Sequence, residues 1–553
     1  MNNHKVKILN ERLFDNEVKY ADMVYLRQPI DDQWHEFTWK ETMLQARKMC
    51  AFLKGLGLQK GDKVSIFSKN CAEWFIADFA ISLGGFISIP LFATQHKDNI
   101  KYVLEHAEVK AIFVGKLDDW KKQESGIPDH IPRISFPYAN PMPAKYKWAD
   151  VLKKTDPDME NFIPNKEDIY TIIYTSGTTG NPKGAMISYG AFAESANILI
   201  ANGVYGVIEE ENLFSYLPLG HITERIIYEN ISTAVKSRVS FTESLPKFAH
   251  NLEEVQPSIF FAVPRIWTQF QKNILSKIPE GIFNVLIRLP IISGVLKKKL
   301  RHKLGLTQAR LIGSGSAPIS MELLKWFRKL DIQIVEGYGR TEDLATCSIN
   351  RYEHFKLGTC GRPFKGVEVK IGEDGEILTR SKAMMTGYYK EPEITKASFT
   401  KDGFLKTGDK GHIDEDGYLT ILGRINDSFK TDKGEFVNPI PIEGKFAKNT
   451  LIEQACLIGL NLPQPVLLAV LSESSKKKSR ADIEKSLGAT LLAINKSMTK
   501  FEKVAHIIIA AEAWTPENAL LTPTLKMKRN VLHDKYLDLA TKAIHDKTLV
   551  LWE

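Results

Sequence analysis

Cysteine is scarce in this chain and is never paired at short spacing. No C-x-x-C motif occurs among the 553 residues, and the five cysteines lie far apart, at Cys50, Cys71, Cys347, Cys360 and Cys456. This odd number and wide spacing exclude a regular disulfide framework and a zinc ribbon. The pattern favours a reducing compartment, so we expect the protein to be cytoplasmic.

Uninterrupted apolar runs of membrane-spanning length are also missing. Residues 79–95 and 454–472 come close, but glycines and prolines interrupt both stretches. Each therefore predicts two buried elements joined by a turn. The first residues, MNNHKVKILNERLF, lack the apolar centre of a signal peptide, so we expect no cleaved secretory leader and a mature chain that begins there.

No large excess of one charge is present. The chain has 74 lysines and arginines against 66 acids, a formal net charge of +8 that we take to be spread along its length. A dedicated nucleic-acid-binding protein normally shows a clustered basic face, so we expect no nucleic-acid partner. A mild positive charge suits anionic small molecules or a transient membrane contact.

The sequence is rich in alternating helix and strand patterns. Apolar residues at helical spacing alternate with short β-branched runs over roughly the first 160 residues, which is typical of βαβ units on a largely parallel sheet. Prolines accumulate over 118–164 and predict a surface loop, after which the alternation returns. We predict an α/β fold with a large multi-sheet body at residues 1–424, which ends in hairpins marked by Asp-Gly pairs. A small α+β domain at residues 425–553 follows.

The strongest chemical signal is YTSGTTGNPKGAMIS at residues 174–188. Glycine and hydroxyl residues follow a predicted strand, so backbone N–H groups can turn toward phosphate oxygens while Lys183 adds positive charge. The loop has no Gly-Lys-Ser/Thr triplet, and a strand rather than a helix follows it, so it is not a Walker A motif. We favour a phosphate-binding loop over a glycine-rich hairpin without a ligand.

Further motifs follow this loop in a recognisable order. The loop, YLPLGHITER, VEGYGRTED, TGD, GR and LTPTLKMKR together resemble the adenylate-forming acyl-CoA synthetase superfamily over nearly the whole chain. SIFFAVPRIW and KGEFVNPIPIE are most similar to its long-chain fatty acid branch. The resemblance implies a mobile C-terminal domain and a two-step reaction. A carboxylate attacks the α-phosphate of ATP, giving acyl-AMP and pyrophosphate, and the thiol of coenzyme A then displaces AMP.

The resemblance implies catalytic roles for three residues. Lys526 would reach the α-phosphate and the carboxylate in the first step. His221 would lie beside the acyl site or gate the second step, with a purely structural role at a helix start left open. Glu342, together with Thr175, would hold Mg²⁺, a hard cation that prefers oxygen ligands. The expected small molecules are a fatty acid, ATP, Mg²⁺ and coenzyme A.

The resemblance also implies a nucleotide site assembled from four motifs. The first loop would hold the β- and γ-phosphates, two segments would form the adenine pocket where Tyr338 stacks on the base, and Asp409 and Arg424 would contact the ribose. The residues implied to bind nucleotide are Thr175, Ser176, Gly177, Thr178, Thr179, Gly180, Lys183, Gly315, Ser316, Ala317, Pro318, Glu336, Gly337, Tyr338, Gly339, Thr341, Asp409 and Arg424. Asn426 falls at the implied hinge, where the family more often has Asp or Lys.

Several alternatives stay open at this point. The acyl acceptor is coenzyme A or a carrier protein, and a catalytically inactive nucleotide-binding protein at the membrane is a further alternative. Residues 273–304 join apolar blocks to a basic run, which predicts a packed surface helix pair or an interfacial helix at a membrane. Trp267 lines an acyl tunnel or belongs to the core. The preferred acid and the oligomeric state are not specified by the sequence.

Overall fold

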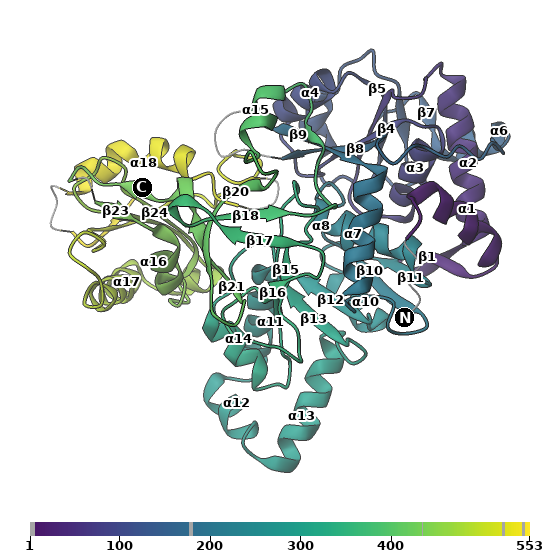
Figure 1. Cartoon of the computed structure of the whole chain (residues 1–553). Helices are drawn as coiled ribbons and strands as arrows, with labels where there is room; N and C mark the ends of the chain where they lie inside the picture. The colour runs from purple at the N-terminus through teal and green to yellow at the C-terminus, as the bar shows by residue number, and fades with distance from the viewer. Residues whose placement is uncertain (1–5, 176–180, 434, 523–525, 545–547) are drawn as a thin grey trace.

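A computed structural model of the chain shows a large body followed by a smaller C-terminal domain, at the left of Figure 1. The structure describes residues 6–175, 181–433, 435–522, 526–544 and 548–553. The body contains four sheets and their covering helices, and the C-terminal domain contains one further four-stranded sheet. The predicted α/β class with a large body and a small C-terminal domain is therefore confirmed.

An eight-stranded sheet contains the first predicted βαβ units. Its order is β19 (Gly387–Tyr388), β9 (Lys183–Ser188), β8 (Ile169–Thr175), β4 (Ile87–Leu91), β3 (Lys63–Phe67), β5 (Val109–Val114), β6 (Arg133–Ser135) and β7 (Tyr146–Lys147). The strands from β8 to β7 pair in parallel, whereas β9 and β19 are antiparallel. The largely parallel sheet predicted from the sequence is present.

The stretch 118–164 is not the plain surface loop that its prolines suggest. It supplies β6 and β7, which extend the eight-stranded sheet, together with α5 (Trp120–Gln123) and α6 (Trp148–Lys154). Strands of two or three residues are too short to show a period of two, which explains why the sequence pattern missed them.

Two further sheets of the body are mixed. One has the order β10 (Glu211–Ser215), β11 (Ser237–Phe241), β1 (Val24–Ile30) and β2 (Gln33–Thr38). The other has the order β12 (Ile259–Ala262), β13 (Leu311–Ser314), β14 (Val335–Tyr338), β15 (Ser348–Ile349) and β16 (Arg362–Pro363). In the second, β12, β13 and β14 are parallel, so their C-terminal ends share one edge, where parallel α/β sheets commonly bind ligands.

The predicted hairpins form an antiparallel sheet at the end of the body. Its order is β17 (Glu368–Ile371), β18 (Glu376–Arg380), β20 (Leu405–Ile413) and β21 (Leu419–Arg424). The short 3₁₀ turn Ile425–Asp427 and the two-stranded pair β22 (Phe429–Lys430) and β23 (Phe436–Val437) lead into the C-terminal domain. The sheet of this domain has the order β24 (Ile452–Ile458), β25 (Val466–Leu471), β26 (Ile507–Ile509) and β27 (Val550–Trp552).

The helices surround these sheets. Those of the body are α1 (Leu9–Lys19), α2 (Trp39–Gly55), α3 (Ala72–Leu83), α4 (Lys97–His106), α7 (Tyr189–Ala201), α8 (Ile222–Glu224), α9 (Ile231–Ala234), α10 (Phe248–Val255), α11 (Pro264–Lys277), α12 (Glu280–Leu286), α13 (Pro290–Lys303), α14 (Met321–Arg328) and α15 (Pro392–Ala397). Those of the C-terminal domain are α16 (Pro439–Phe446), α17 (Arg480–Asn495) and α18 (Arg529–Ile544).

Local sequence explains the two central helices of the body. Thr38 caps α2 by accepting a hydrogen bond from the backbone of Glu41, and the Glu41 carboxylate accepts one from the Thr38 backbone in return. Every residue of α3 is buried, as expected of a helix that is apolar around its whole circumference. Among the described residues, no helix is both long and apolar enough to cross a membrane.

Candidate active site

The phosphate-loop motif lies at the hairpin that joins β8 and β9. Thr175, the last residue of β8, pairs with Lys183, the first residue of β9. The predicted ligands Ser176, Gly177, Thr178, Thr179 and Gly180 lie outside the described residues. The Lys183 ammonium lies 5.8 Å from the ring centroid of Tyr388, so the lysine projects toward the β19 edge of the sheet.

Glu342 is buried and held from two sides. The phenol of Tyr388 donates a 2.8 Å hydrogen bond to one carboxylate oxygen, and the Arg340 guanidinium donates a 3.3 Å bond to the other. Burial alone would raise the pKa of Glu342, but the Arg340 charge and these hydrogen bonds hold the pKa below its usual value. The carboxylate is therefore ionised at neutral pH. Tyr388 also links it to Lys183.

Asp409 brings together three elements of the body. The phenol of Tyr338 on β14 donates a 2.6 Å hydrogen bond to it, and Arg424 on β21 lies 3.4 Å away. Arg340, whose guanidinium also contacts Glu342, lies 3.7 Å from the second carboxylate oxygen of Asp409. Arg340 thus bridges the carboxylate assigned to the ribose and the carboxylate assigned to the metal.

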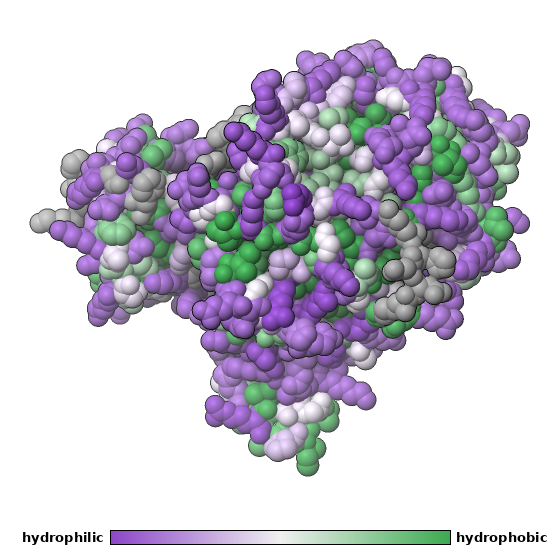
Figure 2. Space-filling model, in the orientation of Figure 1, coloured by the Kyte–Doolittle hydropathy of each residue, from purple (hydrophilic) through white to green (hydrophobic). Residues whose placement is uncertain are grey.

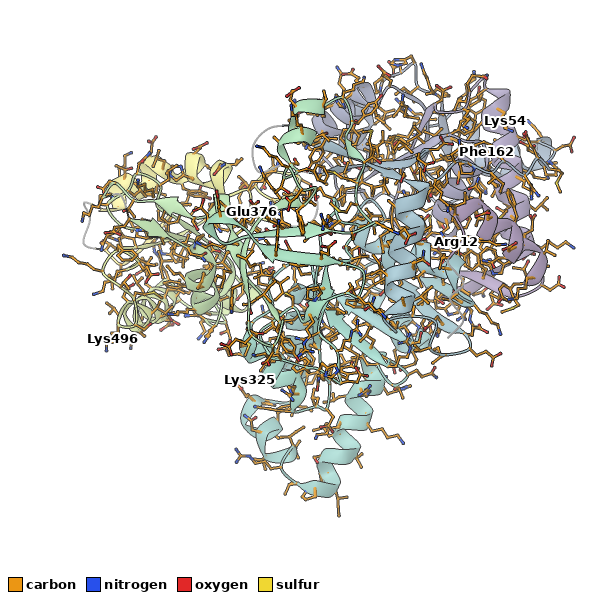
Figure 3. The ribbon with its side chains drawn as sticks, in the orientation of Figure 1. Arg12, Lys54, Phe162, Lys325, Glu376 and Lys496 are labelled. Carbon is orange, nitrogen blue, oxygen red and sulfur yellow. The ribbon has the colours of Figure 1, made fainter. Side chains whose placement is uncertain are left out.

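The part of β20 that precedes Asp409 is held by β18. The Glu376 carboxylate accepts a 2.8 Å hydrogen bond from the backbone N–H of Gly408. Figure 3 labels Glu376 where the body meets the C-terminal domain. Gly408 has a φ of +67°, a conformation that favours glycine, so the TGD sequence accommodates the irregularity in the pairing of β20 with β18 at low cost.

The two predicted adenine-pocket segments lie against each other. A side chain at Gly315 would come within 3.3 Å of the Gly337 carbonyl oxygen, a tight contact that favours glycine at this position. Ser316 has a φ of +66°, which is uncommon for a residue with a side chain, and together with Ala317 and Pro318 it is exposed. Such strain often marks a binding loop.

The rest of the adenine-pocket motif is more enclosed. A side chain at Gly339 would collide with the Ala345 backbone at 2.5 Å, and Thr341 is buried. Burial raises the pKa of Glu336 to about 7, and one of its carboxylate oxygens has no hydrogen-bond partner among the described residues. A buried polar atom without a partner in a cleft indicates a position where a ligand donor can bind.

His221 precedes α8 and caps it. Its Nδ1 accepts a 3.2 Å hydrogen bond from the backbone N–H of Thr223. Burial, and then the charge of Lys526, lowers the pKa of His221 to about 3, against the opposite influence of Glu342. His221 is therefore neutral at physiological pH. The structure shows the capping role and also places the ring within electrostatic reach of two other predicted catalytic residues.

The helix that follows His221 is anchored by a buried charge network that the sequence analysis did not identify. Arg225 begins a π-helix, Arg225–Asn230, and contacts Asp78 of α3 at 2.8 Å and the phenol of Tyr170 on β8 at 2.6 Å. Arg225 and Asp78 are fully buried. A π-helix is rare and often accompanies a functional position.

Lys526 reaches this cluster from the C-terminal domain. Its backbone makes two hydrogen bonds with Thr522. Lys526 is solvent-exposed, yet desolvation by the surrounding protein, followed by repulsion from Arg424, lowers its pKa to about 8. Asp409 and Glu342 act on it in the opposite direction. The lysine thus faces the same carboxylates as Arg340.

The cations near Lys526 differ in role. Arg529 donates hydrogen bonds to the Glu443 carboxylate at 3.2 Å and to the Leu457 carbonyl at 2.7 Å, so it anchors the start of α18 inside the domain. Desolvation lowers the pKa of Lys528, for which no ion pair is found in the described chain. The three cations are therefore not one solvated patch.

Exposed ion pairs join the two parts of the chain. Lys448 lies 2.7 Å from Glu322 of α14, and Arg265 of α11 lies 3.2 Å from Glu453. Asn426, at the expected hinge, lies in the 3₁₀ turn after Arg424, and its side chain is outside the described set.

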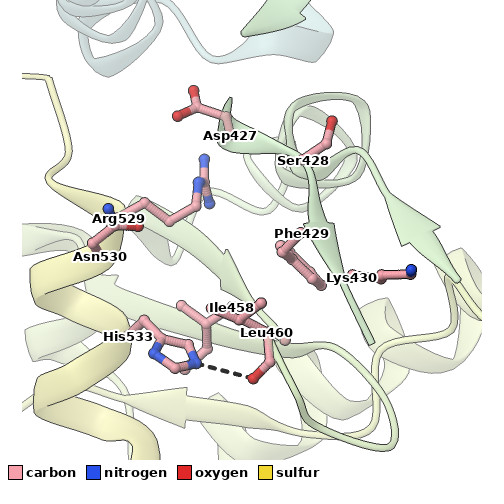
Figure 4. Close-up of a pocket in the computed structure, with 10 residues that line it drawn as sticks. Asp427, Ser428, Phe429, Lys430, Ile458, Leu460, Arg529, Asn530 and His533 are labelled. Atoms are coloured by element: carbon pink, nitrogen blue, oxygen red, sulfur yellow. Dashed lines mark hydrogen bonds between the residues drawn. The ribbon is translucent and has the colours of Figure 1, made fainter. Parts of the chain in front are cut away.

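A cavity of about 290 Å³ lies in the C-terminal domain (Figure 4). Asp427, Phe429, Arg529 and His533 are among its lining residues, and His533 contacts the Leu460 carbonyl at 3.2 Å. None of the residues assigned to catalysis or to nucleotide binding lines this cavity.

Trp267 occupies a core position. It is fully buried, its ring packs against Phe260, Phe270 and Phe327, and its Nε1 donates a 3.3 Å hydrogen bond to the Gly313 carbonyl. These contacts favour the core alternative over a tunnel gate.

Sequence reasoning missed Arg340 and Tyr388. Arg340 lies inside the quoted motif GYGRTE, between two assigned residues, which was a usable signal. Tyr388 comes from a segment about 45 residues after Glu342, and nothing in its local sequence indicates that it contacts this carboxylate. As for metals, the described residues contain no group of three or more His, Cys, Asp or Glu side chains placed to hold an ion.

The arrangement concentrates positive charge around two fixed carboxylates. Arg340, Arg424, Lys183 and Lys526 converge on this region from the body and the C-terminal domain. Such a cluster of charges can bind a polyphosphate and stabilise charge that develops on phosphate oxygens.

Comparison with known proteins identifies the family. Residues 14–389 match the AMP-binding enzyme model, and residues 426–546 match the AMP-binding enzyme C-terminal domain. The chain is 28% identical over 594 residues to the long-chain-fatty-acid–CoA ligase FadD15 of Mycobacterium tuberculosis, with 97% of this chain and 96% of that protein covered. It is 28% identical over 577 residues to fatty acyl-CoA synthetase A of Dictyostelium discoideum, with 92% and 85% covered.

Solved structures show the same fold. The adenylation domain of a carboxylate reductase from Mycobacterium chelonae has a TM-score of 0.83 at 20% identity and covers 98% of this chain and 92% of that one. ATP-bound MatB from Rhodopseudomonas palustris has a TM-score of 0.74 at 22% identity, with 96% and 99% covered. Since the family models match most of the sequence, the chain belongs to the AMP-binding enzyme family.

Proposed function

We propose that this protein is an ATP-dependent acid–thiol ligase that converts a fatty acid to acyl-AMP and then to acyl-CoA. The observation that carries the proposal is the position of Lys526, which interacts electrostatically with Glu342 and Asp409 although it comes from the other end of the chain. The match to relatives named as fatty acid–CoA ligases, over nearly the full length, supports a long-chain acid as the substrate.

In the first step, the carboxylate oxygen of the acid attacks the α-phosphate, and the bond to pyrophosphate breaks. Attack of one anion on another needs fixed positive charge, which Lys526 and Lys183 would supply. Asp409 would accept hydrogen bonds from the ribose hydroxyls, and Arg340 would hold Asp409 and Glu342 in place. The Nδ1 of His221 accepts the Thr223 N–H, so the neutral imidazole carries its proton on Nε2 and can donate a hydrogen bond beside the acyl group without repelling Lys526.

Glu342 fits a role in magnesium binding. It is ionised, oriented by Tyr388, and it is a single carboxylate, as suits an ion that takes most of its ligands from phosphate oxygens and water. Thr175 is the second proposed ligand. Bound Mg²⁺ would neutralise phosphate charge.

In the second step, the sulfur of coenzyme A attacks the acyl carbon, and the bond to AMP breaks. We propose domains at residues 1–424 and 425–553 and a turn of the second domain that withdraws Lys526 before this step. The end of β21 at Arg424, the 3₁₀ turn that follows and the family match that begins at residue 426 support this boundary.

A two-part assay tests the function. Purified protein is incubated with ATP, Mg²⁺ and acids from acetate to stearate, and both pyrophosphate and acyl-CoA are measured. We expect thioester formation to rise with chain length. Pyrophosphate release with acylation of a carrier protein, but not of coenzyme A, would favour the carrier-protein alternative. Absence of pyrophosphate release with every acid would favour an inactive nucleotide-binding protein.

We also propose a cytoplasmic location with peripheral membrane contact. All five cysteines are free and four are buried, which suits a reducing compartment.

A further inference from the structure

Segment 271–304 concentrates most of the net charge of the chain. It contains eight lysines and arginines but a single acid, Glu280, so it accounts for seven of the eight net positive charges of the protein. The net charge is therefore gathered in one helical segment, not spread along the sequence as the overall count suggested.

This segment projects from the body as a helical hairpin. Figure 1 shows α12 and α13 extending at the bottom of the molecule. Phe283 is the one buried residue of α12, and α13 has none. The chain returns to the core at Leu304, directly after α13. The free end of the hairpin is thus the turn between the two helices.

Apolar side chains gather around that free end. Twenty large hydrophobic residues are exposed in the described chain. Six of them lie within the fourteen positions 282–295: Ile282, Val285, Leu289, Ile291, Ile292 and Val295. Ile291 is 86% exposed and Val295 67%. Figure 2 shows apolar surface at this lower tip. Apolar side chains grouped in this way on a surface usually mark an interaction site.

Unpaired positive charge follows the apolar tip along α13. Lys298 and Lys299 lie seven residues after Ile291 and Ile292, about 10 Å along the helix axis. In the part of the chain that the structure describes, no carboxylate forms an ion pair with these two lysines, whereas Lys297 is paired with Asp331 at 3.0 Å. The spacing matches the depth of about 5–10 Å to which interfacial helices enter the boundary between headgroups and acyl chains.

We propose that the α12–α13 hairpin docks the protein on an anionic lipid bilayer. The apolar tip enters the boundary between headgroups and acyl chains, and Lys298 and Lys299 contact lipid phosphates. A second copy of this chain would present the same positive charge and be repelled, so charge complementarity favours anionic lipid as the occupant. The proposal rests on the surface and does not require the ligase activity proposed above.

Vesicle flotation of the full-length protein tests this proposal. Vesicles of phosphatidylcholine alone and vesicles that also contain phosphatidylglycerol are compared at about 0.15 M salt. We expect binding to the anionic vesicles and much weaker binding to the neutral ones. Ile291→Asn with Ile292→Asn should lower binding about tenfold or more. Lys298→Gln with Lys299→Gln should lower it about tenfold and reduce its salt dependence.

Matched controls use sites elsewhere on the surface. Lys153→Gln with Lys154→Gln neutralises an adjacent exposed pair at the end of α6, and Val18→Asn changes an apolar residue that is 82% exposed; both should bind vesicles as the wild type does. The hairpin variants should keep the wild-type circular dichroism spectrum.

Three results would overturn the proposal: no vesicle binding by the wild type, equal binding by wild type and hairpin variants, or self-association that the hairpin variants abolish while vesicles bind none of the proteins. Turnover of octanoate, a water-soluble acid, is measured separately. Its absence in the wild type would count against the ligase function and leave the vesicle result standing.

Discussion

The phenol of Tyr338 donates a 2.6 Å hydrogen bond to Asp409, which joins the β14 segment of the nucleotide site to the β20 hairpin. The two residues are 71 positions apart, and the bond fixes the orientation of the carboxylate that we propose binds the ribose. We therefore expect two functions for Tyr338: its ring would offer a stacking surface for the base, and its hydroxyl would position Asp409.

Tyr338→Phe separates these two functions. The ring remains, but Asp409 loses a hydrogen bond to a charged acceptor, which is worth about 1.5–3 kcal/mol. We expect KM for ATP to rise about tenfold and kcat to change less, measured by pyrophosphate release under saturating acid. Tyr352→Phe, at another tyrosine of the body outside the site, is the control. An unchanged KM for ATP in Tyr338→Phe would show that the bond does not position a ribose ligand.

Lys526→Ala should separate the two half-reactions. Loss of a fixed positive charge at the reacting phosphate should lower acyl-AMP formation by about 10²–10³-fold, measured as pyrophosphate release. Conversion of supplied acyl-AMP to acyl-CoA should be largely preserved. Lys528→Ala, two residues away, is the matched control and should retain both steps. Equal loss of both half-reactions in Lys526→Ala would remove the lysine from its assigned role.

The lowered pKa of Lys526 predicts an alkaline limit to activity. Its pKa of about 8 means that the ammonium form, which the first step needs, is present below that pH and is lost as the pH rises through it. We expect kcat/KM for ATP to fall with an apparent pKa near 8. His221 stays neutral above its pKa of about 3, so its titration should not change kcat/KM for ATP in the neutral pH range.

Lys526→Arg provides the check on this assignment. Arginine keeps its charge at all accessible pH values, so any residual activity of this variant should lack the alkaline limb. If the limb is the same in Lys526→Arg and in the wild type, another group is responsible for it.

Glu342→Gln should change the magnesium requirement. The amide keeps the shape of the side chain but removes the charge that suits a divalent cation, so the Mg²⁺ concentration for half-maximal pyrophosphate release should rise about tenfold. Tyr388→Phe, which leaves the charge but removes one orienting bond, should give a smaller rise. Glu373→Gln, on an exposed turn, should give none. A wild-type magnesium dependence in Glu342→Gln would exclude the metal role.

Asp78→Asn tests the buried charge network that anchors the helix after His221. Arg225 would keep Glu229, at 3.0 Å, as its remaining buried carboxylate partner, and breaking one buried ion pair usually costs up to about 3–5 kcal/mol of unfolding free energy. We expect a lower urea midpoint for the unfolding of the body. Asp15→Asn, at an exposed ion pair, should leave the midpoint unchanged. A wild-type midpoint in Asp78→Asn would mean that the network adds nothing to stability.

The sequence predicts the elements of this fold where apolar periodicity is long. IYTIIYT is a strand and MELLKWFRKL contains a helix because each pattern persists over at least seven residues. Strands β6 and β7 were missed because a two- or three-residue strand is specified by its neighbours in the sheet.

Prediction of the site residues from local sequence has the same limit. Glu342 and Asp409 stand in recognisable motifs, but their shared partner Arg340 and the orienting phenol of Tyr388 appear only when distant segments come together. The burial that shifts the pKa of His221 and of Lys526 likewise depends on tertiary packing.

The hydrogen bonds of Arg529 tie the chain just after Lys526 to the rest of the C-terminal domain. Two residues separate Lys526 from Arg529, and Glu443 and Leu457 bind the arginine to the rest of its domain, so we expect a retreat of the lysine to carry the domain with it. The contacts Lys448–Glu322 and Arg265–Glu453 that such a rotation would release are open to water, and pairs of that kind are weak and are screened by salt. Ionic strength should therefore change the rate at which the enzyme passes from the first half-reaction to the second.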